Sequence, residues 1–114
     1  MANTFKLVTK ANVTSSDVIY TPDSVTTVIL GLILGNTTTS QVTATVSLAS
    51  STSSRAGDNN EDNQTVELIT NAPIPAGSSL ELLAGNNVVM EINDAISVAA
   101  SGSTVVALSI MEIS

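Results

Sequence analysis

The side chains that could do chemistry in this chain of 114 residues are mostly oxygen donors, because the sequence contains no histidine and no cysteine. The densest group is the acidic stretch from Asp58 to Asp62, whose alternating carboxylates and amides are ligands that Ca²⁺ prefers. An EF-hand loop starting at Asp58 would need glycine and glutamate where this chain has Asn63 and Ile69. We therefore interpret the stretch as a solvated loop, and we predict no metal site and no cofactor.

Catalytic residues are not indicated either. Acid–base catalysis needs two carboxylates that converge in a pocket. Each glutamate that follows the acidic stretch stands in a predicted strand, at a position expected to face solvent, namely Glu67, Glu81, Glu91 and Glu112. A serine nucleophile would have no histidine as its base, and neither lysine completes a Ser-x-x-Lys pattern. The sequence predicts that the protein is not an enzyme.

The charge of the chain excludes two classes of partner. Three basic residues stand against ten acidic ones, for a net charge of −7. Nucleic acids and anionic membrane surfaces are both recognised through a basic footprint, and the only aromatic residues that could stack on bases are Phe5 and Tyr20. We predict no nucleic-acid and no membrane partner. The first residues lack a basic region followed by an apolar core, so we also expect no secretory signal. We expect the protein to be made and used from the cytosol, without signal-dependent export.

Alternating apolar and polar residues, separated by turn signals at intervals of about 8–12 residues, predict short β-strands and no helix. The expected strands are residues 5–10, 17–20, 25–35, 42–48, 65–70, 79–83, 88–92, 95–99 and 104–113. The predicted fold class is all-β: a two-sheet antiparallel β-sandwich of jelly-roll or Greek-key type, with eight or nine short strands in one domain over residues 1–114. The strand at 42–48 follows 25–35 after a polar turn, which predicts a hairpin between them.

The longest apolar run, Val25 to Gly35, is the element around which the others are arranged. Its two glycines would each destabilise a helix by about 1 kcal/mol, and its β-branched residues favour a strand. Strict alternation puts Val28, Leu30, Leu32 and Leu34 on one face, and Ile29, Gly31 and Ile33 on the other. Both faces are apolar, as are both faces of the last strand, although only one face of a strand meets the core of a sandwich.

This surplus of apolar surface predicts assembly, because large exposed apolar patches are rare on soluble monomers. We expect a neighbouring subunit to cover the second face, the alternative being a loop of the same chain. A charge introduced at Leu32 is then expected to give a folded monomer. The predicted partner is a second copy of the chain, with a trimer favoured. The candidate oligomer-interface residues are Val28, Leu30, Leu32, Leu34, Val105, Met111 and Ile113.

The second half of the chain resembles small virion structural proteins of tailed bacteriophages, of the kind that infect marine bacteria and cyanobacteria. The resemblance rests mainly on residues 72–98 and on the closing Met-Glu-Ile-Ser. The opening Met-Ala-Asn-Thr-Phe-Lys and the Val-Ile-Leu-Gly-Leu of the central run are also similar to that group. The resemblance implies a β-scaffold located in the virion, with the major capsid protein or other virion proteins as partners.

Two places in the particle fit that resemblance. One is a capsid decoration, or cement, protein that sits on the head and stabilises it, which the long polar loop favours. The other is a neck, collar or tail component arranged in a ring. An alternative hypothesis, from a different functional class, is a host-adhesion or carbohydrate-binding module. The near absence of aromatic residues disfavours it, because sugar rings usually stack on aromatic faces.

Overall fold

The computed structural model describes residues 3–51, 63–83 and 87–113, and the strands it contains fall close to the predicted ones. The acidic stretch Asp58 to Asp62 lies outside the described residues. The nine strands are β1 (Asn3–Val13), β2 (Ser16–Tyr20), β3 (Thr26–Asn36), β4 (Val42–Ala49), β5 (Thr65–Ile74), β6 (Ser79–Leu82), β7 (Val88–Met90), β8 (Ala95–Ala100) and β9 (Thr104–Ile113). No described residue belongs to a helix, so none of the described segments is a helix able to span a bilayer.

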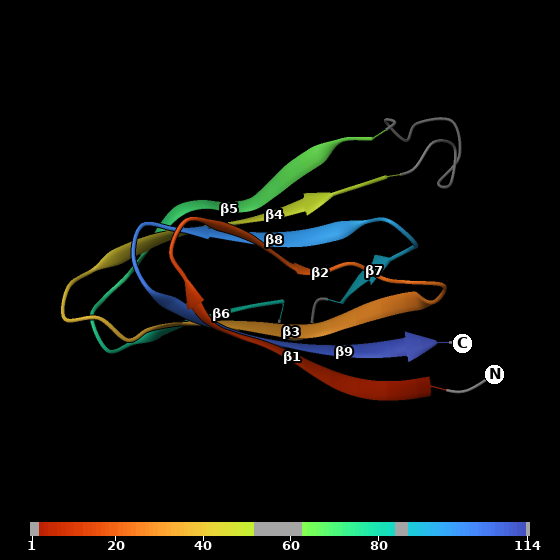
Figure 1. Cartoon of the computed structure of the whole chain (residues 1–114), viewed down its shortest axis with the longest axis horizontal. Coiled ribbons are helices and arrows are strands. Elements are labelled where there is room, and N and C mark those ends of the chain that lie inside the picture. The colour runs from red at the N-terminus through yellow and green to blue at the C-terminus, as the bar shows by residue number, and fades with distance from the viewer. Residues whose placement is uncertain (1–2, 52–62, 84–86, 114) are drawn as a thin grey trace.

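The strands form two antiparallel sheets that stack as a sandwich (Figure 1). One sheet has the order β1-β9-β3-β6, with β7 also paired to β3, and the other has the order β2-β8-β4-β5. Most connections pass from one sheet to the other, and this strand order is that of a jelly roll. The predicted fold class is therefore confirmed.

The predicted hairpin between the third and fourth strands is wrong, because β3 and β4 lie in different sheets. The buried Asn36, at the end of β3, holds the crossing. Its Nδ2 donates to the backbone oxygens of Ser40 at 2.8 Å and Ile74 at 2.9 Å. Its Oδ1 accepts from the backbone N–H of Thr38 at 2.9 Å. A polar turn that looks like a hairpin loop is thus a bridge between the layers.

The first and last strands pair along most of their length. β1 and β9 are in continuous antiparallel register from Asn3 opposite Ile113 to Lys10 opposite Val106. The N-terminal end of β1 and the C-terminal end of β9 therefore lie side by side at one end of the sandwich (Figure 1). β1 forms the edge of its sheet, and β9 separates it from β3.

The core between the sheets is aliphatic, as the scarcity of aromatic residues requires. Inward positions alternate with outward ones along β4, β8 and β9. The core side chains exposed by 2% or less include Ile29, Leu32, Leu34, Val46, Ile96, Val98, Leu108 and Ile110.

A β-bulge in β3 changes which of its side chains enter this core. The pairing of β3 with β9 shifts between Ile29 and Gly31, so that one additional residue stands in β3. Thr27 and Ile29 are buried before the shift, and Leu32 and Leu34 after it. The strict alternation predicted from the sequence therefore fails beyond Ile29, and Ile33 faces outward.

Candidate assembly surface

The sheet of β1, β9 and β3 carries apolar side chains on its outer face as well as its inner one. The register places Phe5 opposite Met111, which in turn lies opposite Val28. Further along the sheet, Thr9, Ala107 and Ile33 lie in one row in the same way. We call the outward set the apolar face, and its members are Phe5, Leu7, Val28, Ile33, Val89, Val105, Ala107, Met111 and Ile113.

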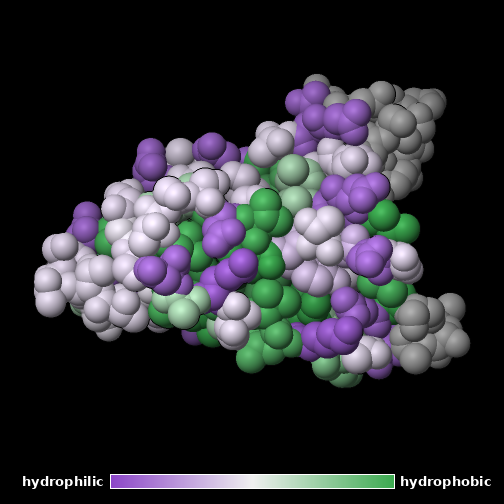
Figure 2. All heavy atoms as spheres, in the orientation of Figure 1, coloured by the Kyte–Doolittle hydropathy of each residue, from purple (hydrophilic) through white to green (hydrophobic). Residues whose placement is uncertain are grey.

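Several members of the apolar face are strongly exposed. The exposed fraction is 70% for Phe5, 65% for Leu7, 62% for Val89 and 46% for Ile33. In Figure 2, hydrophobic residues form a band down the middle of the view, interrupted by hydrophilic ones, and reach the lower edge, where Figure 1 places β1 and β9. The upper edge, on the side of β4 and β5, is mostly neutral or hydrophilic (Figure 2).

The structure divides the predicted interface residues into two groups. Val28, Val105, Met111 and Ile113 lie on the apolar face and are half-buried, and Leu30 is half-buried at the bulge. The side chains of Leu32 and Leu34 point into the core instead, with exposed fractions of 1% and 0%, so their assignment to an outward face is wrong. The bulge at Gly31 is the cause.

Sequence reasoning missed four exposed members of the face, namely Phe5, Leu7, Ile33 and Val89. A glycine inside a strand often marks a bulge, so Gly31 was the signal that could have moved Ile33 to the outer face. Phe5 and Leu7 share one side of β1 by alternation, but the sequence does not show which side of a sheet is covered.

Small residues make the middle of the apolar face hollow. One depression of about 260 Å³ is lined by Leu7, Gly31, Ala107 and Ser109 among others. A second, of about 490 Å³, includes Gly35, and both depressions are bordered by Ile33 and Ala107. The surface therefore combines projecting side chains with cavities that a side chain could fill.

The two glycines of β3 differ in what surrounds them. A Cβ added to Gly35 would lie 2.9 Å from Cγ2 of Val105, so neighbouring packing explains that glycine. A Cβ added to Gly31 would meet nothing within 4 Å, and the φ of Gly31 is not in the left-handed region. Glycine in a strand interior often marks a bulge, and Gly31 lies at the register shift of β3.

A polar cluster links the two sheets near the paired chain ends. Lys6 Nζ lies 2.7 Å from Glu112 Oε1, and the Tyr20 hydroxyl donates to Glu112 Oε2 at 2.6 Å. The oxygen of the buried Thr27 hydroxyl is 3.0 Å from that of Tyr20. The expectation that Glu112 faces solvent is wrong, because its side chain turns between the sheets to meet partners from β1 and β2.

The contacts of this cluster shift two ionisations in opposite directions. The hydrogen bonds from Lys6 and Tyr20 lower the pKa of the Glu112 carboxyl from its ordinary value of 4.5. Burial, together with the Glu112 carboxylate, raises the pKa of the Tyr20 phenol from 10.0. The cluster is therefore a carboxylate held in its charged form by a lysine and a neutral tyrosine. Because the tyrosine belongs to β2 and the other groups to the opposite sheet, these hydrogen bonds link the two sheets.

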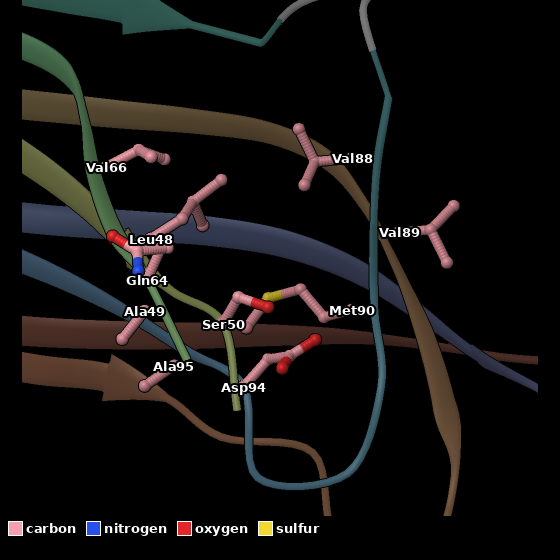
Figure 3. Close-up of a pocket in the computed structure, with 10 residues that line it drawn as sticks. All are labelled: Leu48, Ala49, Ser50, Gln64, Val66, Val88, Val89, Met90, Asp94 and Ala95. Atoms are coloured by element: carbon pink, nitrogen blue, oxygen red, sulfur yellow. The ribbon is translucent and has the colours of Figure 1, made fainter. Parts of the chain in front are cut away.

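A separate depression of about 300 Å³ opens between the sheets beside β5 and β7 (Figure 3). Val88 and Met90 extend to one side of β7, and Val89 extends to the other (Figure 3). The Asp94 carboxylate at its border accepts the backbone N–H groups of Ser51 at 2.8 Å and Glu91 at 2.9 Å, so it holds a turn. Within the described parts of the chain, no three acidic side chains gather as metal ligands.

No known protein family and no curated protein matches the sequence. A solved structure of Bacillus endospore appendages, a novel family of disulfide-linked pili, aligns over 97% of this chain and 86% of that one. The two chains are 14% identical and superpose with a TM-score of 0.47.

Proposed function

We propose that this protein is a non-catalytic structural protein that works by packing against copies of itself and against companion proteins. The observation that carries the proposal is the apolar face. Burying one Leu, Val, Ile or Phe side chain contributes about 1.5–3 kcal/mol relative to leaving it exposed. Four such side chains are at least 46% exposed on this one face. Only the 46–70% of each side chain that is still exposed remains to be buried, but a contact between two copies buries two such sets. Their combined burial is then comparable to the loss of translational and rotational freedom on association, about 4–15 kcal/mol.

We propose further that the assembly is part of a bacteriophage virion, most specifically a decoration protein on the head. The resemblance in residues 72–98 supports this, and so does a compact β-body with a broad apolar side. Both lysines of the described residues are ion-paired within the chain, Lys6 with Glu112 and Lys10 with Asp17. That arrangement suits contact with a protein shell better than contact with packaged nucleic acid. The partners on this view are copies of the chain, in a trimer or similar cluster, and the major capsid protein.

Copy number in purified particles tests the place of the protein. Quantitative mass spectrometry of virions is expected to give hundreds of copies per particle if the protein decorates the head. A few dozen copies or fewer would instead indicate a ring at the neck, collar or tail. Absence from washed particles would overturn the virion assignment altogether.

A glycan array separates the structural proposal from an adhesion module. We expect no glycan binding, because Phe5 is the one strongly exposed aromatic residue and the Tyr20 hydroxyl is bound to Glu112. Saturable binding to a defined glycan, lost on Phe5→Ala, would favour the adhesion module instead.

A further inference from the structure

β1 differs from every other edge strand of the sandwich in being long and regular. Its pairing with β9 runs without interruption from Asn3 to Lys10. At the same side of the sandwich, β2 has five residues and a register shift. At the opposite side, β5 contains two register shifts and Pro73, while β6 and β7 have four and three residues. Short strands, bulges and prolines are the devices that keep edges from pairing with other chains, and up to Lys10 β1 has none of them.

Lysines on an edge, and charged side chains that point inward, are further such devices, but both lysines of β1 are ion-paired within their own molecule. Lys6 and Lys10 lie opposite Ile110 and Val106, so they are on the side of the strand that faces the second sheet. There they meet the carboxylates of Glu112 and Asp17. The backbone N–H and C=O groups on the free side of β1 are therefore left accessible to another strand.

Charge indicates what kind of strand can approach. The chain carries ten acidic residues and a net charge of −7, yet β1 contains neither aspartate nor glutamate. The opposite edge carries Glu67 on β5 and Glu81 on β6. Two copies that meet through β1 therefore keep Glu67 and Glu81 of one copy away from those of the other, whereas two copies that meet through the opposite edge would bring them together.

We propose that β1 of one copy pairs antiparallel with β1 of a second copy, about a two-fold axis at Leu7. This inference rests on the proposed self-assembly and is independent of any place in a virion. Residues 4–10 of each copy pair, with Phe5 opposite Thr9, Lys6 opposite Val8 and Leu7 opposite its own equivalent. No two lysines then lie directly opposite each other. This favours the register, because like charges in directly opposed positions are destabilising. The two sheets become one continuous sheet, and the apolar faces of both copies lie on the same side of it.

The absence of cysteine from the chain allows a direct test of this register. In Leu7→Cys the two new thiols would stand on directly opposed residues, whose Cα atoms are about 4.5–5.5 Å apart in an antiparallel pair. That separation is within the range for a disulfide. Oxidation of the full-length variant with diamide is expected to convert most of it to a covalent dimer, measured on a non-reducing gel and by intact mass.

Two further variants serve as matched partners, and a third as a control. Phe5→Cys alone and Thr9→Cys alone are expected not to cross-link, because each residue is about 14 Å from its own equivalent, four residues along the strand. A mixture of these two variants is expected to cross-link as a heterodimer. Val18→Cys, which stands at a position 52% exposed on β2, is the control for random collision and is expected to remain monomeric on the gel.

The proposal is overturned if Leu7→Cys cross-links no more than Val18→Cys. It is also overturned if a mixture of Phe5→Cys and Leu7→Cys cross-links better than Phe5→Cys with Thr9→Cys, since that would indicate another register. Sedimentation of the unmodified protein separates this failure from failure of the proposed function. An oligomer that persists without β1 cross-linking leaves assembly through the apolar face in place, whereas a monomer at all concentrations removes both.

Discussion

The two sheets of the sandwich share one aliphatic core, but the side chains on their outer faces differ in polarity. Outward positions of β4 and β8 carry Thr43, Thr45, Ser47 and Ser97, with alanines between them. The exposed large apolar residues of this sheet lie on its edge strands, Val18 on β2 and Val66 and Leu68 on β5. The corresponding positions of β1, β3 and β9 carry Phe5, Leu7, Val28, Ile33 and Met111. The outward positions of the central strands are therefore polar or small in one sheet and largely apolar in the other. The apolar face is thus confined to one side of the molecule. The aliphatic composition of the whole chain does not by itself explain that face.

The largest expected effect is on stability, and it distinguishes an inward residue of β3 from the adjacent outward one. Leu32→Ala removes a side chain that is 1% exposed and should lower the free energy of unfolding by about 2–5 kcal/mol. Ile33→Ala, at 46% exposure, should lower it by less than about 1 kcal/mol in the separated subunit. Urea denaturation at low protein concentration measures both. By the same reasoning Leu32→Asp is expected to unfold the chain, in contrast to the folded monomer that strict alternation predicted.

The second expected effect compares the two outer faces directly. Ile33→Asp places a charge in the middle of the apolar face and should break the contacts made through that face, leaving at most the dimer paired through β1, while the circular dichroism spectrum stays that of a folded β-protein. Thr43→Asp places the same charge on the outer face of the other sheet and should leave the assembly intact. Sedimentation velocity measures the sizes. Equal dissociation by both variants would show that the two faces do not differ in function.

A third, smaller effect distinguishes the two glycines. Gly35→Ala should destabilise the subunit by about 1–3 kcal/mol, because the added Cβ would lie 2.9 Å from Cγ2 of Val105. Gly31→Ala should leave the separated subunit unchanged, or more stable by about 0.4–1 kcal/mol, because nothing in the chain opposes its Cβ. If a partner packs closely on the apolar face, the same Gly31 variant should nevertheless assemble less tightly. A Gly31 variant that assembles as well as the parent protein would show that the space is not occupied.

The smallest expected effect concerns the polar cluster that joins the sheets. The pKa of Glu112 is lower in the folded chain than its ordinary value of 4.5, so its contacts stabilise the fold fully above that pH. This contribution is lost as the pH falls through the folded-state pKa. Glu112→Gln should therefore be less stable than the parent protein near neutral pH, and the difference should shrink on acidification. Denaturant midpoints measured between pH 7 and pH 3 give the two curves, and parallel curves would contradict the linkage.

Most of the fold could be predicted from local pattern, because alternation and turn residues act within a few positions of each other. The strand at Val42 to Leu48 needed nothing else. The errors all involve contacts made at a distance. The bulge after Ile29 is defined against β9, and the crossing at Asn36 depends on the backbone of Ile74. Glu112 turns inward to meet Tyr20, which is 92 positions away in the sequence.

The candidate surface was half predictable for the same reason. An excess of apolar residues is visible in a sequence, and it correctly indicated a sheet with hydrophobic side chains on both of its sides. The division of those residues into inner and outer sets required the register between β3 and β9, and this displaced Leu32 and Leu34 from the outer set.

The pairing of Asn3 with Ile113 has a practical consequence for engineering. Because the two termini of the described chain emerge at one corner, a peptide fused to either of them would be presented from the same place. A short linker could also join them, so that the chain could be reopened at a surface turn elsewhere. Such a circular permutant would free β1 from its terminal position while keeping its residues beside β9.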